Sequence, residues 1–299
     1  MTSTVVKTGI TIEYEVLGEG DPLLLVMGLG AQMVAWSDPF VFGLVDRGFQ
    51  VIRFDNRDIG LSSKIDAPPP STGRAFAGVI MRRFAKSAYL LGDMADDAAG
   101  LLDVLGVERA HVVGASMGGM ISQELAIRHP QRVASLTSIM STTGSRRVGQ
   151  PKLSLLAKLA RTVDGGRDTY VERDIVTGRL ISGSLFDATE ARVLAERALA
   201  RNFCPEGVLR QTAAIAASPD RTRALGKLTV PTLVVHGLED PLVQPSGGLA
   251  TTRAIPGARL LAFPDMGHNL PTARLAEVHE AIVETAARAG FRGRAASTI

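Results

Sequence analysis

The sequence predicts an α/β fold built on a mostly parallel sheet with helices on both faces. Continuously apolar runs such as 23–27 and 49–54 are typical of strands that are buried on both faces. Segments with helical spacing separate these runs, and this alternation favours parallel pairing. The chain has 299 residues, of which 45% are hydrophobic, so it can bury a full core. In such folds, functional side chains lie at the carboxyl ends of the strands.

The N-terminal half is predicted to begin with an antiparallel hairpin, because residues 5–6 and 10–16 alternate apolar and polar side chains around Gly9. The expected elements that follow are strands at 23–27 and 49–54 and helices at 40–46 and 93–105. The stretch 74–91 has a helical pattern and contains the basic run Met81-Arg82-Arg83-Phe84. We interpret it as a solvated helix near a cleft, with contact to a membrane or a partner as the alternative.

In the C-terminal half, the strand pattern continues at 111–114 and 133–140 and then stops. The segment 141–226 is helical in composition and is interpreted as a cap inserted after the sixth strand. The elements expected after position 140 are helices at 153–160, 189–201 and 275–289 and strands at 230–235 and 258–263. The predicted organisation is a core of residues 1–140 and 227–290, a cap at 141–226 and a disordered tail at 291–299.

Composition excludes several classes of protein. The net charge of +3 is small and spread along the chain, which argues against nucleic-acid binding. The single cysteine, Cys204, cannot form an intrachain disulfide. The N-terminus lacks the layout of a signal peptide, and no apolar run is long enough to cross a bilayer, so we expect a cytoplasmic protein without stable membrane insertion. The sequence also contains no metal-ligand cluster and no dinucleotide-binding glycine motif, and we expect no metal and no cofactor. It does not indicate an oligomeric state.

One stretch carries a candidate nucleophile. Residues Val112 and Val113 end a β-branched run, and Gly114-Ala115-Ser116-Met117-Gly118-Gly119 follows directly before a helical pattern. A Gly-x-Ser-x-Gly sequence between a strand and a helix is typical of a sharp, strained turn that exposes the serine hydroxyl. A glycine-rich turn with a structural serine is the alternative interpretation.

A serine hydroxyl needs a base, and the base needs a group to orient it. Of the five histidines, His268 alone is predicted to lie in the loop between the last strand and the last helix, where it is free to approach Ser116. The orienting acid is expected in a loop that follows a strand between these two residues. The loop after strand 230–235 offers Glu239 and Asp240, and we favour Asp240 because Pro241 stiffens its backbone and its side chain is shorter. Glu239 is the fallback.

The order Ser116, Asp240, His268 resembles that of the α/β-hydrolases, whose fold the predicted elements also match. A closer likeness covers the chain from Thr11 to Ala289 apart from the cap. Four stretches carry it: Met27-Gly28, the run from Asp55 to Ser62, the run from Asp93 to Asp97, and Gly267-His268-x-Leu270-Pro271. Together they resemble the aclacinomycin methylesterase group and related bacterial carboxylesterases.

The resemblance implies further site residues. The Met117 amide begins a helix, where the dipole favours an anion, and it is expected to donate to an oxyanion. Family position points to the Leu29 amide as the second donor. The chain has Met27-Gly28 where the family commonly has His-Gly, but a backbone donor does not need that side chain. Trp36 falls where the group has an aromatic residue lining the cleft, although it could equally be a core residue.

The dipeptide Arg57-Asp58 stands where most α/β-hydrolases have Arg-Gly. We interpret it as a buried ion pair that pins its loop, without a catalytic role.

The predicted function is hydrolysis of a small-molecule carboxylic ester through an acyl-enzyme. Relatives that attack an sp³ carbon carry an aspartate at the turn, so Ser116 favours acyl transfer. Thioesterase, lactonase, C–C bond hydrolase and perhydrolase activities would use the same three residues and remain alternatives. The sequence also allows a ligand-binding relative with little or no turnover, or a lipase that uses Met81–Phe84 as a membrane anchor. The apolar cap helices favour a medium-sized, hydrophobic acyl or alcohol group.

Overall fold

The computed structural model describes residues 2–80, 85–159 and 166–292, and it contains one sheet with the strand order β1-β2-β4-β3-β5-β6-β7-β8. Strands β1 and β2 pair antiparallel around Gly9, β2 pairs antiparallel with β4, and the remaining pairs are parallel. The mostly parallel sheet is therefore confirmed. The strands are β1 (Thr2–Val5), β2 (Thr11–Leu17), β3 (Asp21–Val26), β4 (Phe49–Phe54), β5 (Ala110–Ala115), β6 (Val133–Ile139), β7 (Thr232–Gly237) and β8 (Arg259–Phe263).

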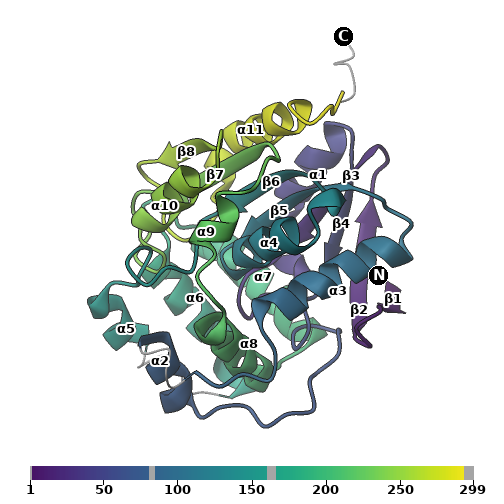
Figure 1. Ribbon diagram of the computed structural model, residues 1–299. Helices are drawn as coiled ribbons and strands as arrows, with labels where there is room; N and C mark the ends of the chain where they lie inside the picture. Colours follow the sequence, from purple (N-terminus) through teal and green to yellow (C-terminus); the bar gives the residue numbers. More distant parts are fainter. Residues whose placement is uncertain (1, 81–84, 160–165, 293–299) are drawn as a thin grey trace.

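Helices cover both faces of this sheet (Figure 1). Because side chains alternate along a strand, Leu24 and Val26 of β3 enter one core, while Leu23 and Leu25 enter the other. This explains why the strand sequences are continuously apolar. The first face is covered by α3 (Leu91–Val104), α4 (Met117–Arg128) and α10 (Ser246–Ala254), and the second by α1 (Asp38–Asp46) and α11 (Leu275–Ala287).

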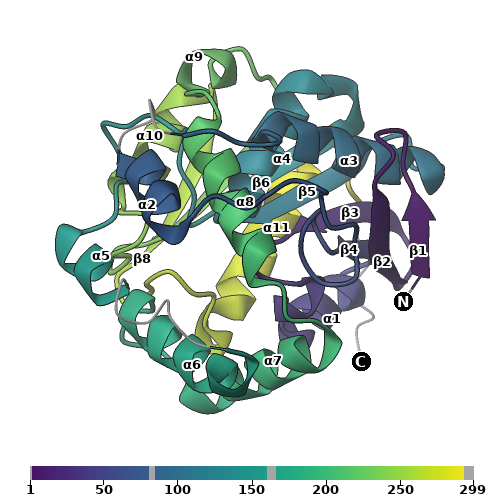
Figure 2. The same ribbon diagram turned by 90° about the horizontal axis from the view of Figure 1, so that it is seen from below.

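Between β6 and β7 the chain leaves the sheet and forms several helices at its carboxyl edge (Figures 1 and 2). We call residues 141–226 the cap. Helix α2 (Thr72–Ile80), from the core half of the chain, packs against α8 (Pro205–Ala217) of the cap. The cap helices are α5 (Leu153–Leu159), α6 (Tyr170–Ile181), α7 (Ala188–Arg201), α8 (Pro205–Ala217) and α9 (Thr222–Leu225). Short 3₁₀ turns lie at Met33–Ala35, Pro130–Arg132, Arg167–Thr169 and Thr272–Arg274.

Two predicted segments fall partly outside the described residues. Helix α2 ends at Ile80, so the basic run Met81–Phe84 and any role for it as an anchor lie outside them. Of the predicted tail, residues 293–299 also lie outside. Phe291, at the start of that predicted tail, is buried and stacks on Phe49 with ring centroids 4.0 Å apart.

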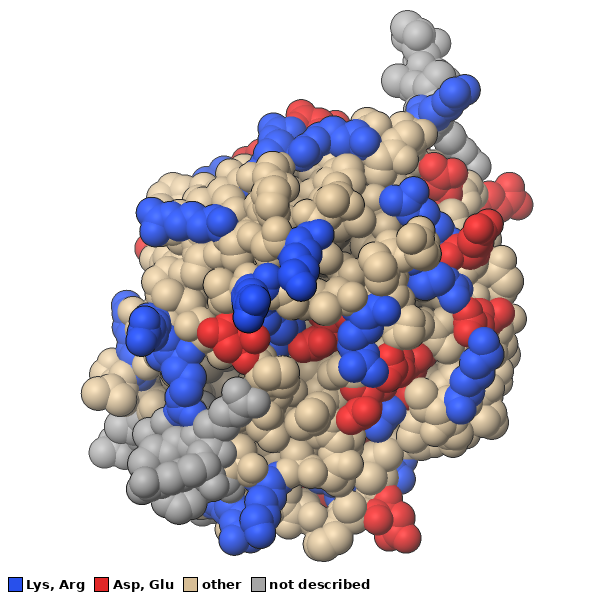
Figure 3. Space-filling view, viewed as in Figure 1, with Lys and Arg blue, Asp and Glu red and all other residues tan. Residues whose placement is uncertain are grey.

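The surface carries charges of both signs. Basic and acidic side chains both occur on the face shown in Figure 3, interspersed with uncharged surface. In the part of the chain that the structure describes, we find no helix with the length and hydropathy needed to cross a bilayer.

Candidate active site

The sharp turn at Ser116 joins the end of β5 to the start of α4. Ser116 has φ 55° and ψ −119°, a strained conformation for a residue with a side chain. Its neighbours must be small, because a Cβ on Gly118 would lie 1.9 Å from the Val26 carbonyl oxygen and a Cβ on Gly114 would lie 2.2 Å from the Gly118 oxygen. The turn therefore forms only with glycine at these positions, and it holds the serine hydroxyl at the carboxyl edge of the sheet.

The three candidate catalytic side chains meet at this edge. His268 Nε2 lies 2.9 Å from Ser116 Oγ, and His268 Nδ1 lies 2.7 Å from Asp240 Oδ2. A carboxylate only accepts hydrogen bonds, so Nδ1 of a neutral imidazole carries the proton and Nε2 is left to accept from the serine. This geometry allows the imidazole to remove the serine proton.

Asp240 is held rigidly below the imidazole. The residue is only 1% exposed, and its Oδ1 accepts from the amides of Leu242 and Val243, each at 2.8 Å. The fallback residue, Glu239, turns the other way and accepts from the amide and hydroxyl of Ser184 in the cap. The structure thus brings Asp240, and not Glu239, to the histidine.

The other four histidines make different contacts. His129 lies at the end of α4 with Nε2 2.7 Å from Asp96 Oδ1, and His279 bonds the Phe40 carbonyl oxygen. His236 is buried and bonds the Val243 carbonyl oxygen, and burial lowers its pKa despite the nearby Asp240. His111 lies in the core, where burial lowers its pKa to about 4. Burial lowers the pKa values of His111, His236 and His279 and so keeps these side chains neutral at physiological pH. Of the five histidines, His268 is the one that contacts Ser116.

The loop after β3 passes directly beside the nucleophile. A Cβ on Gly28 would lie 3.2 Å from Ser116 Cβ, so the main chain approaches the serine closely there. The next amide belongs to Leu29, and the Met117 amide lies across the serine at the first position of α4. Within the described ranges, neither amide donates to a protein acceptor. At Met27, where the family commonly has histidine, the carbonyl oxygen accepts a hydrogen bond of 2.9 Å from Asn56 Nδ2.

A cleft of about 770 Å³ opens above the serine and is lined mainly by apolar side chains. Its volume is in the range of small-molecule sites. Trp36 fits both interpretations of its role, since it lines the cleft and is also a core residue, 3% exposed and stacked on Phe40. The inward face of α6, which includes Thr177 and Ile181, forms part of the opposite wall.

The prediction that Arg57 and Asp58 form an ion pair with each other is wrong. Both side chains are buried, but Arg57 binds Asp97 of α3 through two hydrogen bonds of 2.6 and 2.7 Å. Asp58 accepts instead from Arg210 of α8 and from the Tyr89 hydroxyl. The loop is pinned as predicted, with partners that lie far away in the sequence.

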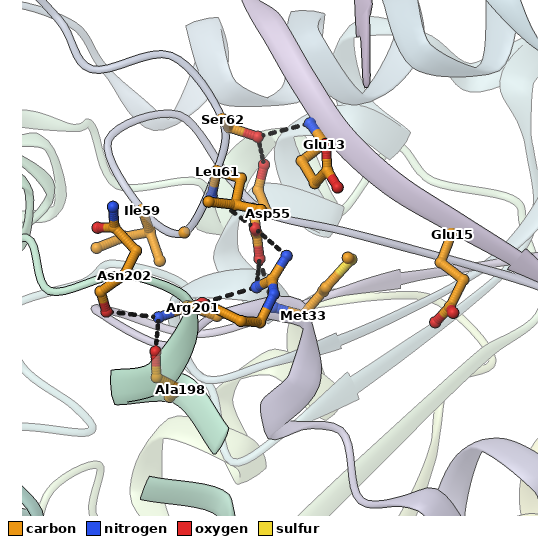
Figure 4. Close-up of polar contacts among 12 residues, drawn as sticks. Glu13, Glu15, Met33, Asp55, Ile59, Leu61, Ser62, Ala198, Arg201 and Asn202 are labelled. Carbon is orange, nitrogen blue, oxygen red and sulfur yellow. Dashed lines mark hydrogen bonds and ion pairs between the residues drawn. The ribbon is translucent and has the colours of Figure 1, made fainter. Parts of the chain in front are cut away.

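Asp55 is a second anchor of the cap that the sequence analysis did not recognise. Its fully buried carboxylate accepts from the Met33 and Leu61 amides and from both terminal nitrogens of Arg201, the last residue of α7 (Figure 4). In Figure 4, Arg201 points from the cap into the core loop after β4. Gln32 extends this contact, because it accepts from Arg201 and donates to the Ala198 and Asn202 carbonyls.

The described residues include no group of three or more His, Cys, Asp or Glu side chains that could hold a metal ion.

Comparison with known proteins agrees with this architecture. A family model described as the alpha/beta hydrolase fold matches residues 21–271. The chain is 31% identical to rhodomycin D methylesterase DnrP of Streptomyces peucetius, over 93% of this chain and 94% of the relative. It is 30% identical to 2-hydroxy-6-oxo-6-phenylhexa-2,4-dienoate hydrolase of Comamonas testosteroni, over 86% and 84%.

Solved structures give the same result. A thermophilic esterase from Thermogutta terrifontis superposes with a TM-score of 0.72 and 26% identity, covering 96% of this chain and 98% of the esterase. The family model spans far more than half of the chain, and the methylesterase exceeds 30% identity over nearly all of it. The predicted resemblance is confirmed: this chain belongs to the alpha/beta hydrolase fold family.

Proposed function

We propose that this protein is a serine hydrolase that cleaves carboxylic esters through an acyl-enzyme. The observation that carries the proposal is the hydrogen-bonded series from Ser116 through His268 to Asp240 at the base of an apolar cleft. Relatives named methylesterase and esterase support an ester as the substrate.

In the proposed reaction, His268 Nε2 takes the hydroxyl proton as Ser116 Oγ attacks the ester carbonyl carbon. Asp240 stabilises the imidazolium that forms. The negative charge on the former carbonyl oxygen is received by the Leu29 and Met117 amides, the second of which is aided by the dipole of α4. His268 then returns its proton to the leaving alcohol, and a water molecule, activated in the same way, hydrolyses the acyl-enzyme.

The cleft suggests the size of the substrate. A volume of about 770 Å³ is far larger than a short acyl chain requires, and its walls are mainly apolar. We therefore expect faster turnover for esters with a medium-sized or large hydrophobic group than for acetate. Thioester, lactone and C–C bond hydrolysis and perhydrolysis would use the same residues, and they are distinguished by substrate.

The test is hydrolysis of p-nitrophenyl esters from acetate to decanoate by the wild type and Ser116→Ala. Ser154→Ala, which removes an exposed hydroxyl from α5, is the matched control. We expect turnover that rises with chain length, is lost in Ser116→Ala and is retained in the control. Wild-type turnover that persists in Ser116→Ala would refute the mechanism. Labelling of Ser116 by a fluorophosphonate without ester turnover would move the search to thioesters, lactones and C–C substrates, and neither turnover nor labelling would favour a ligand-binding role.

A further inference from the structure

The turn that carries the Leu29 amide has a defined backbone form. The Ala31 amide donates to the Gly28 carbonyl oxygen at 3.3 Å, so residues 28–31 form a β-turn. Gly30, its third residue, has φ +70°, whereas Leu29 is not among the described residues with positive φ. Negative φ followed by positive φ defines a type II turn. It differs from a type I turn by a flip of the central peptide, which joins the Leu29 carbonyl to the Gly30 amide.

The group that holds this central peptide comes from the cap. The Gly30 amide donates to Gln211 Oε1 of α8 at 2.9 Å. The other end of the same side chain, Nε2, donates to the Arg57 carbonyl oxygen at 2.9 Å, so Gln211 joins the loops that follow β3 and β4. Gln211 is fully buried, which removes water as a competitor for these bonds.

Helix α8 is itself fixed tightly to the core beside this turn. A Cβ on Gly207 would lie 2.0 Å from the Asp58 carbonyl oxygen, so the helix backbone rests directly on the loop after β4. Val208 lies against Gly30, where an added Cβ would be 3.2 Å from its methyl group. Arg210 adds the buried ion pair with Asp58. The part of α8 that carries Gln211 is therefore held firmly against the core, which fixes the position of the Gln211 carboxamide.

We propose that Gln211 is a positioning residue that holds the oxyanion-binding turn in its type II form. The proposal rests on the proposed function, since it assigns to Leu29 the role of an oxyanion donor. The central peptide and the peptide that carries the Leu29 amide meet at the Leu29 Cα. Loss of the Gln211 acceptor therefore removes a restraint from one side of this residue, and the Leu29 amide is no longer held in a single direction beside Ser116. Removing a whole oxyanion donor costs about 10²- to 10³-fold in kcat, so misdirecting one is expected to cost about tenfold.

The kinetic test compares Gln211→Met with the wild type. Methionine has a similar length and lacks both hydrogen bonds. We expect Gln211→Met to lower kcat about tenfold with KM within about twofold.

A trifluoromethyl ketone with the preferred acyl chain forms a hemiketal oxyanion on Ser116, and the matching methyl ketone reports ground-state binding. In Gln211→Met, the trifluoromethyl ketone should bind about tenfold more weakly, while the methyl ketone binds unchanged. Gln123→Met is the control, because Gln123 is equally buried but contacts Ser138 and Arg221 instead of the turn. It should not alter the ratio of the two inhibitor affinities.

Hydrogen exchange provides a readout that does not need turnover. We expect faster exchange of the 27–32 peptide in Gln211→Met than in the wild type, and no change there in Gln123→Met. Unchanged exchange, an unchanged inhibitor ratio, or an equal loss of both inhibitors would overturn the assignment of Gln211. Failure of the proposed function would give a different result, because the wild type would then show no Ser116-dependent turnover. In that case the exchange experiment would still decide whether Gln211 holds the turn.

Discussion

The ion pair between Arg201 and Asp55 permits a quantitative prediction about how the cap is held. The two terminal nitrogens of Arg201 lie 3.2 and 2.9 Å from the two carboxylate oxygens, and the side chains are only 11% and 0% exposed. In Arg201→Met, a buried carboxylate loses its countercharge, which typically costs about 3–5 kcal/mol. The Met33 and Leu61 amides still bind Asp55, so we expect the lower end, a fall of about 3 kcal/mol in the free energy of unfolding.

A double-mutant cycle separates this pair from the rest of the site. Asp55→Asn removes the charge, and the double variant Asp55→Asn/Arg201→Met should be more stable than the sum of the single losses by about 2 kcal/mol. Urea unfolding can be followed by the fluorescence of Trp36, which is buried and the only tryptophan in the chain. Arg192 of the same helix forms exposed ion pairs with Glu172 of α6 and with Glu196, and Arg192→Met, which breaks them, should cost less than about 1 kcal/mol. A coupling energy below about 0.5 kcal/mol would refute the view that this pair fastens the cap.

Three further outcomes are expected. Gly118→Ala places a Cβ 1.9 Å from a main-chain oxygen and should lower the free energy of unfolding by more than about 2 kcal/mol in urea denaturation, whereas Gly73→Ala, with nothing within 4 Å, should be nearly neutral. Asp240→Asn should lower kcat about 10³-fold or more in the ester assay, because an asparagine no longer fixes the proton on His268 Nδ1. Burial lowers the pKa of His111 from 6.5 to about 4, so the unfolded state binds the extra proton as the pH falls below 6.5. The free energy of unfolding should therefore be about 2 kcal/mol smaller at pH 5 than at pH 7 on account of this residue, and His111→Gln should remove that part of the difference; an equal pH dependence in wild type and variant would contradict it.

Much of the architecture could be predicted because its signals are local. Continuous apolar runs marked the strands, and the strained turn around Ser116 needs a glycine pattern that is legible in the sequence. Asp240 and His268 could be selected because parallel strands bring their carboxyl ends to one edge. The structure places His268 within hydrogen-bonding distance of both Ser116 and Asp240.

The contacts between cap and core could not be predicted, because their partners have no fixed spacing. Asp55 and Asp58 bind arginines 146 and 152 residues away, and the cap sequence contains many arginines without a pattern that marks these two. The sequence suggested that Arg57 and Asp58 bind each other, since adjacent opposite charges invite that inference. The buried role of Gln211 had no signal at all, because a polar residue on an amphipathic helix is normally solvated.

The cap is also joined to the loop of the candidate base, since the His268 amide donates to the Ile181 carbonyl oxygen at the end of α6 and Gly267 packs against Gly183. Together with the bond from Gly30 to Gln211, this means that the inserted segment buttresses both sides of the reaction centre. Recombination that exchanges the cap for that of a relative would therefore change turnover as well as substrate choice. A functional chimera must retain a carboxamide at position 211 and a tight crossing at position 183. The cap is therefore not structurally separable from the loops that carry the candidate catalytic residues.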